Sequence, residues 1–238
     1  MAYAKEDTSL AELKDYRVVP RVKVVQALSR PLIDAGFAEG DIVLMPAKLE
    51  IGPVFDIVPL FFFPEFITWK DRKDKNPETP MIIGRSFDRG SVIAAKAAKP
   101  ETRTEEYGQG MKMRHCEHLN FICIVYGEHD LKGTAITLSF SRGEYRSGRE
   151  FINKIMMRKQ DGVEIPLWGQ VWRCEAAQHS TDQHSWAGLD IVNADVPFIQ
   201  DNEVGGFKQL HEEFKKLHSA ALIQVDRDLD DEEPVAEM

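Results

Sequence analysis

The chain has 238 residues, of which 43% are hydrophobic and 29% charged, the composition of an ordinary globular protein that can bury a core. Its formal net charge is -9, but residues 226–238 hold seven acids and one Arg, which leaves -3 for the rest of the chain. No apolar run reaches the roughly 18 residues of a membrane span, and the first ten residues lack the apolar core of a signal peptide, so we expect no membrane partner and a cytoplasmic protein, in the host cytoplasm if phage-encoded.

The first part of the chain predicts a polar arm followed by extended segments. Residues 1–16 are polar and charged, which is typical of a loose arm or a short helix. Residues 19–28 (VPRVKVVQAL) and 41–51 (DIVLMPAKLEI) predict two strands, with a turn between them. Residues 57–75 form the most aromatic stretch, and both of its faces can be apolar, as in a strand covered by a helix.

The middle of the chain predicts a β-hairpin that follows a polar region. Residues 81–99 indicate a strand and a turn, and residues 99–115 a mobile polar excursion. Residues 119–129 (LNFICIVYGEH) are a compact apolar run, typical of a buried strand. They lead through a tight turn into residues 131–142 (LKGTAITLSFSR), whose side chains alternate with period two, so the two runs pair as a hairpin.

The last part alternates helices and strands before an acidic end. We expect a helix at residues 147–160, a strand at 165–176 and a turn at 176–184. A further strand at 185–198 and a helix at 207–222 follow. Residues 226–238 have too little apolar surface to fold. The many short strands favour a mainly β chain: an OB-like β-barrel with long insertions, flanking α-helices and a disordered acidic C-terminal tail. The predicted divisions are an arm (1–16), a nucleic-acid-binding domain (17–225) and the tail (226–238).

A basic region stands out within this acidic chain. From Lys132 to Lys159 there are seven Lys or Arg residues and two Glu residues. Most charge clusters are solvated rims, but an electrostatic groove beside aromatic rings is what holds single strands without reading their sequence. The candidate DNA-binding cations are Arg142, Arg146, Arg149, Lys154 and Arg158. The acidic tail would compete for this groove as a mimic of a polyanion, so we expect its deletion to tighten DNA binding.

Aromatic residues near these charges are candidate platforms for bases. Stacking of a base on a ring contributes roughly 1–3 kcal/mol. The alternative is that the rings belong to the core, which is the commoner fate of such side chains. The candidates for stacking are Phe66, Trp69, Tyr145, Trp168 and Trp172.

Metal-ligand residue types also gather in one stretch. His115, Cys116, His118 and Cys123 are all types that bind zinc, but their spacing matches none of the usual knuckles. The three cysteines of the chain are an odd number without close pairs, which argues against a disulfide framework. We expect no metal site and no cofactor.

Catalytic signatures are missing from the sequence. It holds no P-loop, no G-x-S-x-G elbow, no dinucleotide fingerprint and no metalloprotease helix. Asp182 and Asp190 could hold a metal for nuclease chemistry, although their spacing does not require it. We therefore expect a protein that is not an enzyme.

The order of these features resembles a known family. PRVKVVQALSRPL, VPLFFFPEFITW, LKGTAITLSFSRGEYRSGREFINKIMMR and PLWGQVWRCEA, within residues 18–200, are similar to single-stranded-DNA-binding proteins of tailed bacteriophages. The resemblance implies an OB-fold that coats single strands during replication and recombination. It also implies an acidic tail that contacts replication proteins. Tails of that family commonly end on an aromatic residue, whereas this chain ends on Met238.

Sequence-independent binding of single-stranded DNA in phage replication and recombination is therefore the expected function. The expected partners are single-stranded DNA and replication proteins, and assembly into a homo-oligomer is left open. The alternatives are a structural or scaffold protein of the virion, whose basic face and acidic end dock neighbouring subunits, and a metal-dependent nuclease.

Overall fold

A computed structural model describes residues 19–71, 73–76, 78–108, 110–180, 185–223 and 225. The predicted arm (1–16) and acidic tail (226–238) lie outside these residues. The chain is mainly β, as predicted, with one large sheet of ten strands. In chain order, these strands are β1 (Arg21–Val24), β2 (Ile42–Met45), β3 (Leu49–Glu50), β4 (Val54–Trp69), β5 (Ile82–Ser86), β6 (Thr104–Glu106), β7 (Lys112–Tyr126), β8 (Ala135–Phe140), β11 (Gln170–Ser180) and β12 (Ser185–Phe198).

Four α-helices and one small hairpin complete the described structure. The helices are α2 (Arg30–Ile33), α3 (Val92–Ala98), α4 (Tyr145–Met157) and α5 (Val204–Ser219). The hairpin pairs β9 (Lys159–Gln160) with β10 (Val163–Glu164) directly after α4. None of the described helices is long and apolar enough to cross a membrane.

The sheet is strongly curved but does not close into a barrel. Its strand order is β12-β11-β4-β7-β8-β1-β2-β3, and β1 runs parallel to β8 while the other neighbours are antiparallel. The side chain of Gln26 donates to the carbonyl of Ala187 at 2.6 Å, which brings the chain after β1 close to β12. Among the described residues no backbone ladder joins β12 to β1, so the expected closed barrel is not formed there.

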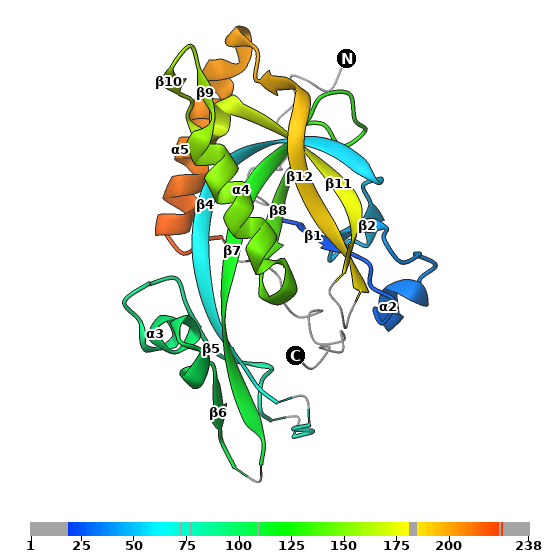
Figure 1. Cartoon of the computed structure of the whole chain (residues 1–238), viewed down its shortest axis with the longest axis vertical. Coiled ribbons are helices and arrows are strands. Elements are labelled where there is room, and N and C mark those ends of the chain that lie inside the picture. The colour runs from blue at the N-terminus through cyan, green and yellow to red at the C-terminus, as the bar shows by residue number, and fades with distance from the viewer. Residues whose placement is uncertain are drawn as a thin grey trace, which may run out of the picture.

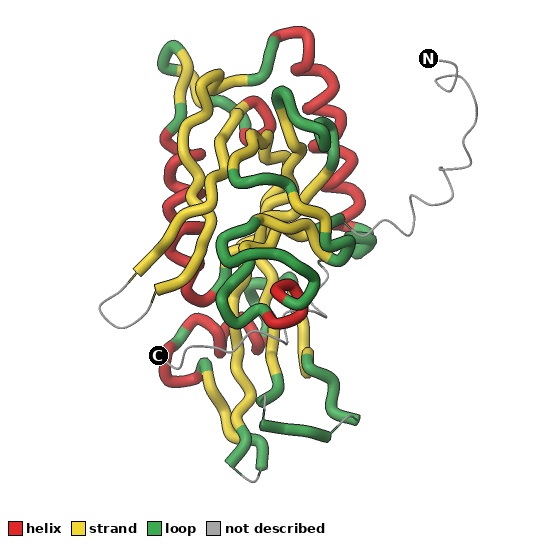
Figure 2. Tube along the Cα trace, turned by 90° about the vertical axis from the view of Figure 1, so that its right-hand side faces the viewer, coloured by secondary structure: helices red, strands yellow, loops and turns green. Residues whose placement is uncertain are grey.

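Two strands are long enough to reach beyond the main body. Strands β4 and β7 pair from Asp56 and Tyr126 to Trp69 and Arg114. Their far halves carry β5 on one side and β6 on the other, with α3 packed against them, and project at the bottom of Figure 1. From here on we use the word arm for this projection of β4, β5, β6 and β7 only, and not for residues 1–16. The same elongated part is seen from the side in Figure 2.

Helices cover the two faces of the main sheet because side chains alternate along each strand. Helix α4 packs on one face through Phe151, whose ring lies 4.9 Å from that of Phe121 and 5.4 Å from that of Trp172. Helix α5 packs on the other face through Phe207 and Phe214. The two helices lie along the upper part of the molecule in Figure 1.

Both predicted helices are present, with shifted ends. The pattern at 147–160 corresponds to α4, which begins earlier and ends at Met157, and the pattern at 207–222 corresponds to α5. Helix α3 was missed, because residues 81–99 indicated only a strand and a turn. Its start is capped by the Ser91 hydroxyl, which accepts from the backbone N–H of Ala94.

The strand boundaries also differ from expectation in several places. The region 99–115 is not an open excursion: β6 pairs with β7, which begins at Lys112 rather than near residue 119. The first strand covers only Arg21–Val24, and β11 continues to Ser180, into the predicted turn. Polar residues enter these strands because neighbouring strands pair their backbone groups, which a pattern of apolar residues does not register.

Gly148 sets how closely α4 approaches the sheet. A Cβ atom there would lie 2.6 Å from the Cβ of Phe140, too close for real atoms. We expect Gly148→Ala to lower the free energy of unfolding by about 1–3 kcal/mol through this overpacking. Gly205→Ala in α5 is the matched control, because a Cβ atom at residue 205 would meet nothing within 4 Å. This substitution should raise the free energy of unfolding by about 0.5–1 kcal/mol. Urea unfolding of both variants measures this, and equal stability of the two would contradict the close packing.

Candidate functional site

Helix α4 and the turn directly before it present three of the predicted cations to solvent. The Arg146 side chain is 89% exposed, and its Nε donates to Glu150 at 2.9 Å, one turn along the helix. Arg149 is exposed on the same side of the helix. Arg142 precedes the helix and places its guanidinium 5.9 Å from the centre of the Trp69 ring. All three side chains are exposed, although each also has a neighbour within the fold.

The other two predicted cations serve the structure instead. The ammonium of Lys154 donates to the carbonyl of Ile191 at 2.7 Å. The guanidinium of Arg158 lies 3.4 Å from the centre of the Trp172 ring and donates to the carbonyls of Val171 and Pro197. Burial lowers the pKa of Arg158 to about 10, so it stays charged at neutral pH. Both residues tie α4 to strands β11 and β12. Their role as DNA contacts stays a prediction.

The predicted stacking residues are not an open platform. Phe66, Trp69 and Trp172 are 4%, 5% and 2% exposed. Trp168 is half-buried against the cluster under α5. Tyr145 is half-buried and donates to Glu117 at 2.7 Å, and burial raises the pKa of its phenol.

Two of these rings, Phe66 and Trp172, are buried because a helix packs over each of them. Trp172 lies under Phe151 of α4, and Phe66 lies under Ala94 and Ala97 of α3. The core alternative was correct for these rings. The expectation of single-stranded DNA as a partner held by base stacking is therefore contradicted. The expectation of replication proteins as partners depended on it and loses its support.

The expected metal-ligand types do not converge. Neighbouring residues on a strand face opposite sides, so residues 115 and 118 of β7 lie on different faces of the sheet. His115 is bonded through Nδ1 to the Thr68 hydroxyl at 2.8 Å, and burial lowers its pKa. Cys123 is buried in the core, which raises the pKa of its thiol. Within the described residues no group of three His, Cys, Asp or Glu side chains could hold a metal.

The acidic pair weighed for nuclease chemistry cannot be assembled from the described structure. Asp182 lies outside the described residues. Asp190 lies 3.4 Å from the imidazole of His179 on β11, across the β11–β12 ladder. Nuclease chemistry therefore gains no support from this part of the chain.

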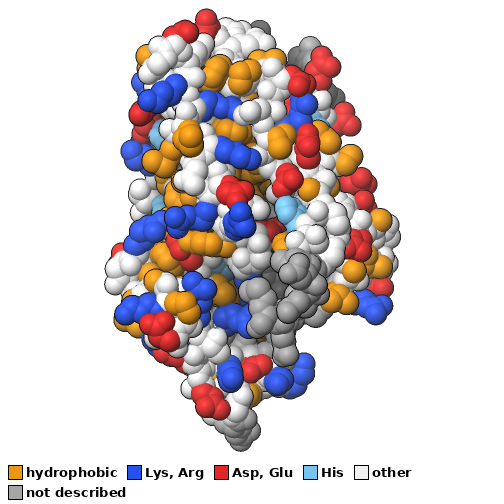
Figure 3. All heavy atoms as spheres, viewed as in Figure 1, with side chains coloured by type: hydrophobic (Ala, Val, Ile, Leu, Met, Phe, Trp, Pro, Cys, Tyr) orange, Lys and Arg blue, Asp and Glu red, His pale blue; other side chains and the backbone are white. Residues whose placement is uncertain are grey.

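The sequence analysis missed a group of exposed apolar side chains at the end of α4. Met156 and Met157 are 71% and 78% exposed, and Val163 of the following hairpin is also exposed. Steps of three and four residues lead from Arg146 and Arg149 to both methionines, so the four side chains lie on the same side of α4. A helical wheel drawn from the sequence could have shown this surface. We define the α4 face as Arg142, Arg146, Arg149, Met156 and Met157. Figure 3, in which α4 faces the viewer as in Figure 1, shows Lys and Arg side chains mixed with hydrophobic ones across this side.

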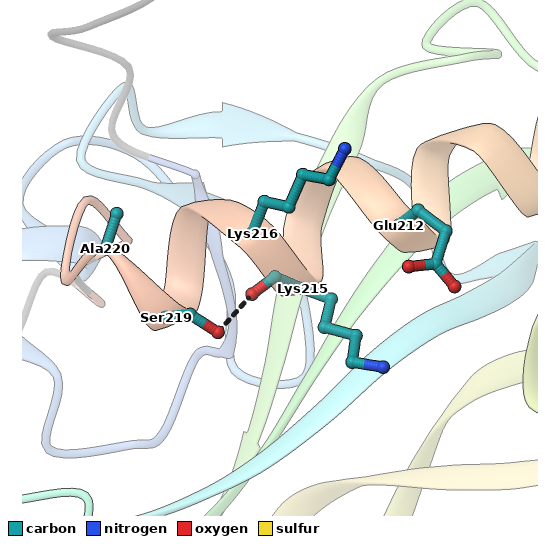
Figure 4. A pocket seen from close by; sticks show the side chains of 5 residues that line it. All are labelled: Glu212, Lys215, Lys216, Ser219 and Ala220. Atoms are coloured by element: carbon teal, nitrogen blue, oxygen red, sulfur yellow. Dashed lines mark hydrogen bonds between the residues drawn. The ribbon is translucent and has the colours of Figure 1, made fainter.

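A shallow hollow on α5 offers no comparable site. It is lined by Glu212, Lys215, Lys216, Ser219 and Ala220. In Figure 4 the two lysine side chains extend away from each other, and the Ser219 hydroxyl donates to the carbonyl of Lys215 within the helix. Its polar groups do not converge on one point, which a ligand site would require.

Comparison with known proteins gives one match. A family model described as "Pam3 phage gp34-like protein" matches residues 7–221. No curated protein and no solved structure matches the chain.

Proposed function

The chain belongs to the family of Pam3 phage gp34-like proteins, and on that premise we propose that it is a structural or assembly protein of the phage particle. In this role the α4 face docks onto an acidic protein surface that carries apolar side chains. The role requires no catalysis. The observation that carries the proposal is the exposure of Arg146 and Arg149, and of Met156 and Met157 two turns further on, along the same side of α4.

The chemistry of the α4 face suits a protein partner. Arg and Met are enriched at protein interfaces, where Lys and Glu are depleted. An unbranched methionine adapts its shape to an apolar partner, and an arginine pairs bidentately with a carboxylate. Exposed apolar side chains would add little to binding a phosphate backbone, which is held mainly by charge.

Charge also selects the kind of protein surface. The α4 face contributes three arginines, and Glu144 and Glu150 are the acids nearest to them in the sequence. An acidic partner would be steered towards such a surface, and the attraction would weaken as salt is added. The methionines would supply the part of the affinity that salt does not weaken.

The composition of purified particles tests the proposed role. Particles of the phage that encodes the chain are banded on a density gradient and analysed by mass spectrometry. We expect the protein in the banded particles, or in assembly intermediates separated from the same lysate. Abundant protein in the lysate but none in either fraction would contradict a structural or assembly role.

A titration with oligonucleotides separates this role from nucleic-acid binding. The full-length protein is mixed with labelled oligonucleotides of several lengths over a range of salt concentrations. We expect no saturable binding that depends on length, because three of the rings predicted to stack on bases are buried and the other two are half-buried. Saturable, length-dependent binding that falls steeply with salt would overturn the proposal.

A further inference from the structure

One face of the arm carries none of the described helices. Residues directly paired across antiparallel strands point to the same side, so Trp69 and Arg114 share a face with the pair Glu65 and His118. Cys116 lies between them on the same face. Helix α3 packs on the opposite face, through Phe66, Ala94 and Ala97. We call the helix-free side the outer arm face.

The chain returns to the outer arm face just before its acidic end. Ile223 and Val225 are buried in the cluster under α5. Arg85 of β5 pairs with Ile67, on the same side as Glu65, and forms an ion pair with Glu65. Its Nη2 donates to the carbonyl of Val225 at 2.9 Å. Val225, the residue before the acidic segment, therefore lies beside the outer arm face.

This face holds a buried donor that lacks an acceptor. Trp69 is 5% exposed, and its indole N–H has no hydrogen-bond acceptor among the described residues. A buried N–H without an acceptor is costly, so native structures nearly always supply one. A carboxylate is a strong acceptor for it.

Cations surround the same ring. The guanidinium of Arg142 lies 5.9 Å from the centre of the Trp69 ring. The exposed Arg114 of β7 is paired with Trp69 in the β4–β7 ladder. The chain beyond Val225 carries seven acids against one Arg. Charge is therefore complementary between the outer arm face and the segment that starts beside it.

We propose that the acidic segment 226–238 binds in cis to the outer arm face, with its carboxylates against Arg114, Arg142 and the indole N–H of Trp69. The distance is within reach: four strand residues from Glu65 to Trp69 span about 13 Å, and 13 extended residues reach about 45 Å. This contact differs from the role of the α4 face and shares only Arg142 with it. It places the acidic segment on the arm instead of along α4.

The reactivity of Cys116 reports whether the face is covered. Cys116 is partly exposed on this face, whereas Cys123 and Cys174 are buried in the core. We expect iodoacetamide to alkylate Cys116 several-fold faster after deletion of 226–238 than in the full-length protein at low salt. High salt should bring the full-length protein close to the rate of the deletion variant, because the contact is ionic. Intact mass counts the modified thiols, and modification of all three would reveal unfolding.

Variants of unchanged length separate charge from truncation. Replacing the seven acids of 226–238 by Asn or Gln, or Arg114→Gln alone, should also raise the Cys116 rate. Arg146→Gln is the matched control, since this exposed arginine lies on α4, and it should leave the rate unchanged. Equal rates in the full-length protein, the deletion variant and the neutralised variant would overturn the proposal. The particle composition is measured separately, so failure of one proposal leaves the other standing.

Discussion

Phe151→Ala is expected to lower the free energy of unfolding by about 3–5 kcal/mol, the usual cost of removing a buried phenyl group. The ring is 1% exposed and joins α4 to the rings of Phe121 and Trp172. Its loss would leave a cavity under the helix that carries the exposed arginines. Urea unfolding followed by circular dichroism measures the change.

Met156→Ala is the control on the same helix. This side chain is largely exposed, so its truncation should change stability by less than about 0.5 kcal/mol. A loss for Phe151→Ala no larger than that of the control would show that α4 is not anchored as described.

Arg85→Ala is expected to lower the free energy of unfolding by about 3–5 kcal/mol, the usual cost of removing one partner of a buried ion pair. Glu65 is fully buried, and Arg85 pairs with it while also donating to the carbonyl of Val225. Asn120 donates to Glu65 at 3.3 Å, which would not replace a positive charge. Thermal or urea unfolding at neutral pH measures the loss.

The double variant Arg85→Ala with Glu65→Gln distinguishes the buried charge from simple loss of packing. Replacing the Glu65 carboxylate by a neutral amide along with removal of Arg85 should recover much of the stability, since a buried amide is far less costly than a buried charge that has lost an ion-pair partner. Arg146→Ala breaks only an exposed pair with Glu150 and should cost about 0.5 kcal/mol or less. A double variant as unstable as Arg85→Ala would contradict the account of the buried pair.

The sequence predicted best those elements whose pattern is set locally. The apolar spacing of Phe207 and Phe214 predicted α5, and that around Phe151 predicted α4. The mainly β character followed from the alternating segments, of which residues 131–142 contain β8. In each case one side of the element faces the core, so the residue pattern records the contact.

The site was predicted less well because it depends on what lies across the fold. Arg158 at the end of α4 and Trp172 in β11 lie in different elements of the chain and meet only through packing of the fold. There the two residues, each predicted to contact DNA, contact each other in a cation–π pair. Trp69 lies at the end of β4 beside charged residues, which suggested exposure, yet the structure buries it. The burial of a strand residue is set by segments that are distant in the sequence, and no local pattern reports it.

The two methionines at the end of α4 are apolar residues that the structure exposes, whereas Trp69 and Trp172 were expected to be exposed and are buried. Met156 and Met157 were noted only as part of a family resemblance, although apolar residues at the end of a helix carry information when they face solvent. Their exposure follows from where Phe151 directs the helix. That direction is known only from the fold.

Incorporation of a charge-reversed protein into phage particles tests the central claim most directly. A phage that lacks the gene is complemented with Arg142→Glu, Arg146→Glu, Arg149→Glu, or with the matched control Lys208→Glu, Lys215→Glu, Lys216→Glu on the exposed side of α5. If the α4 face docks an acidic neighbour, the first variant folds but is lost from particles and assembly intermediates, and the control is retained. Retention of both variants at the wild-type level would contradict the docking role of α4.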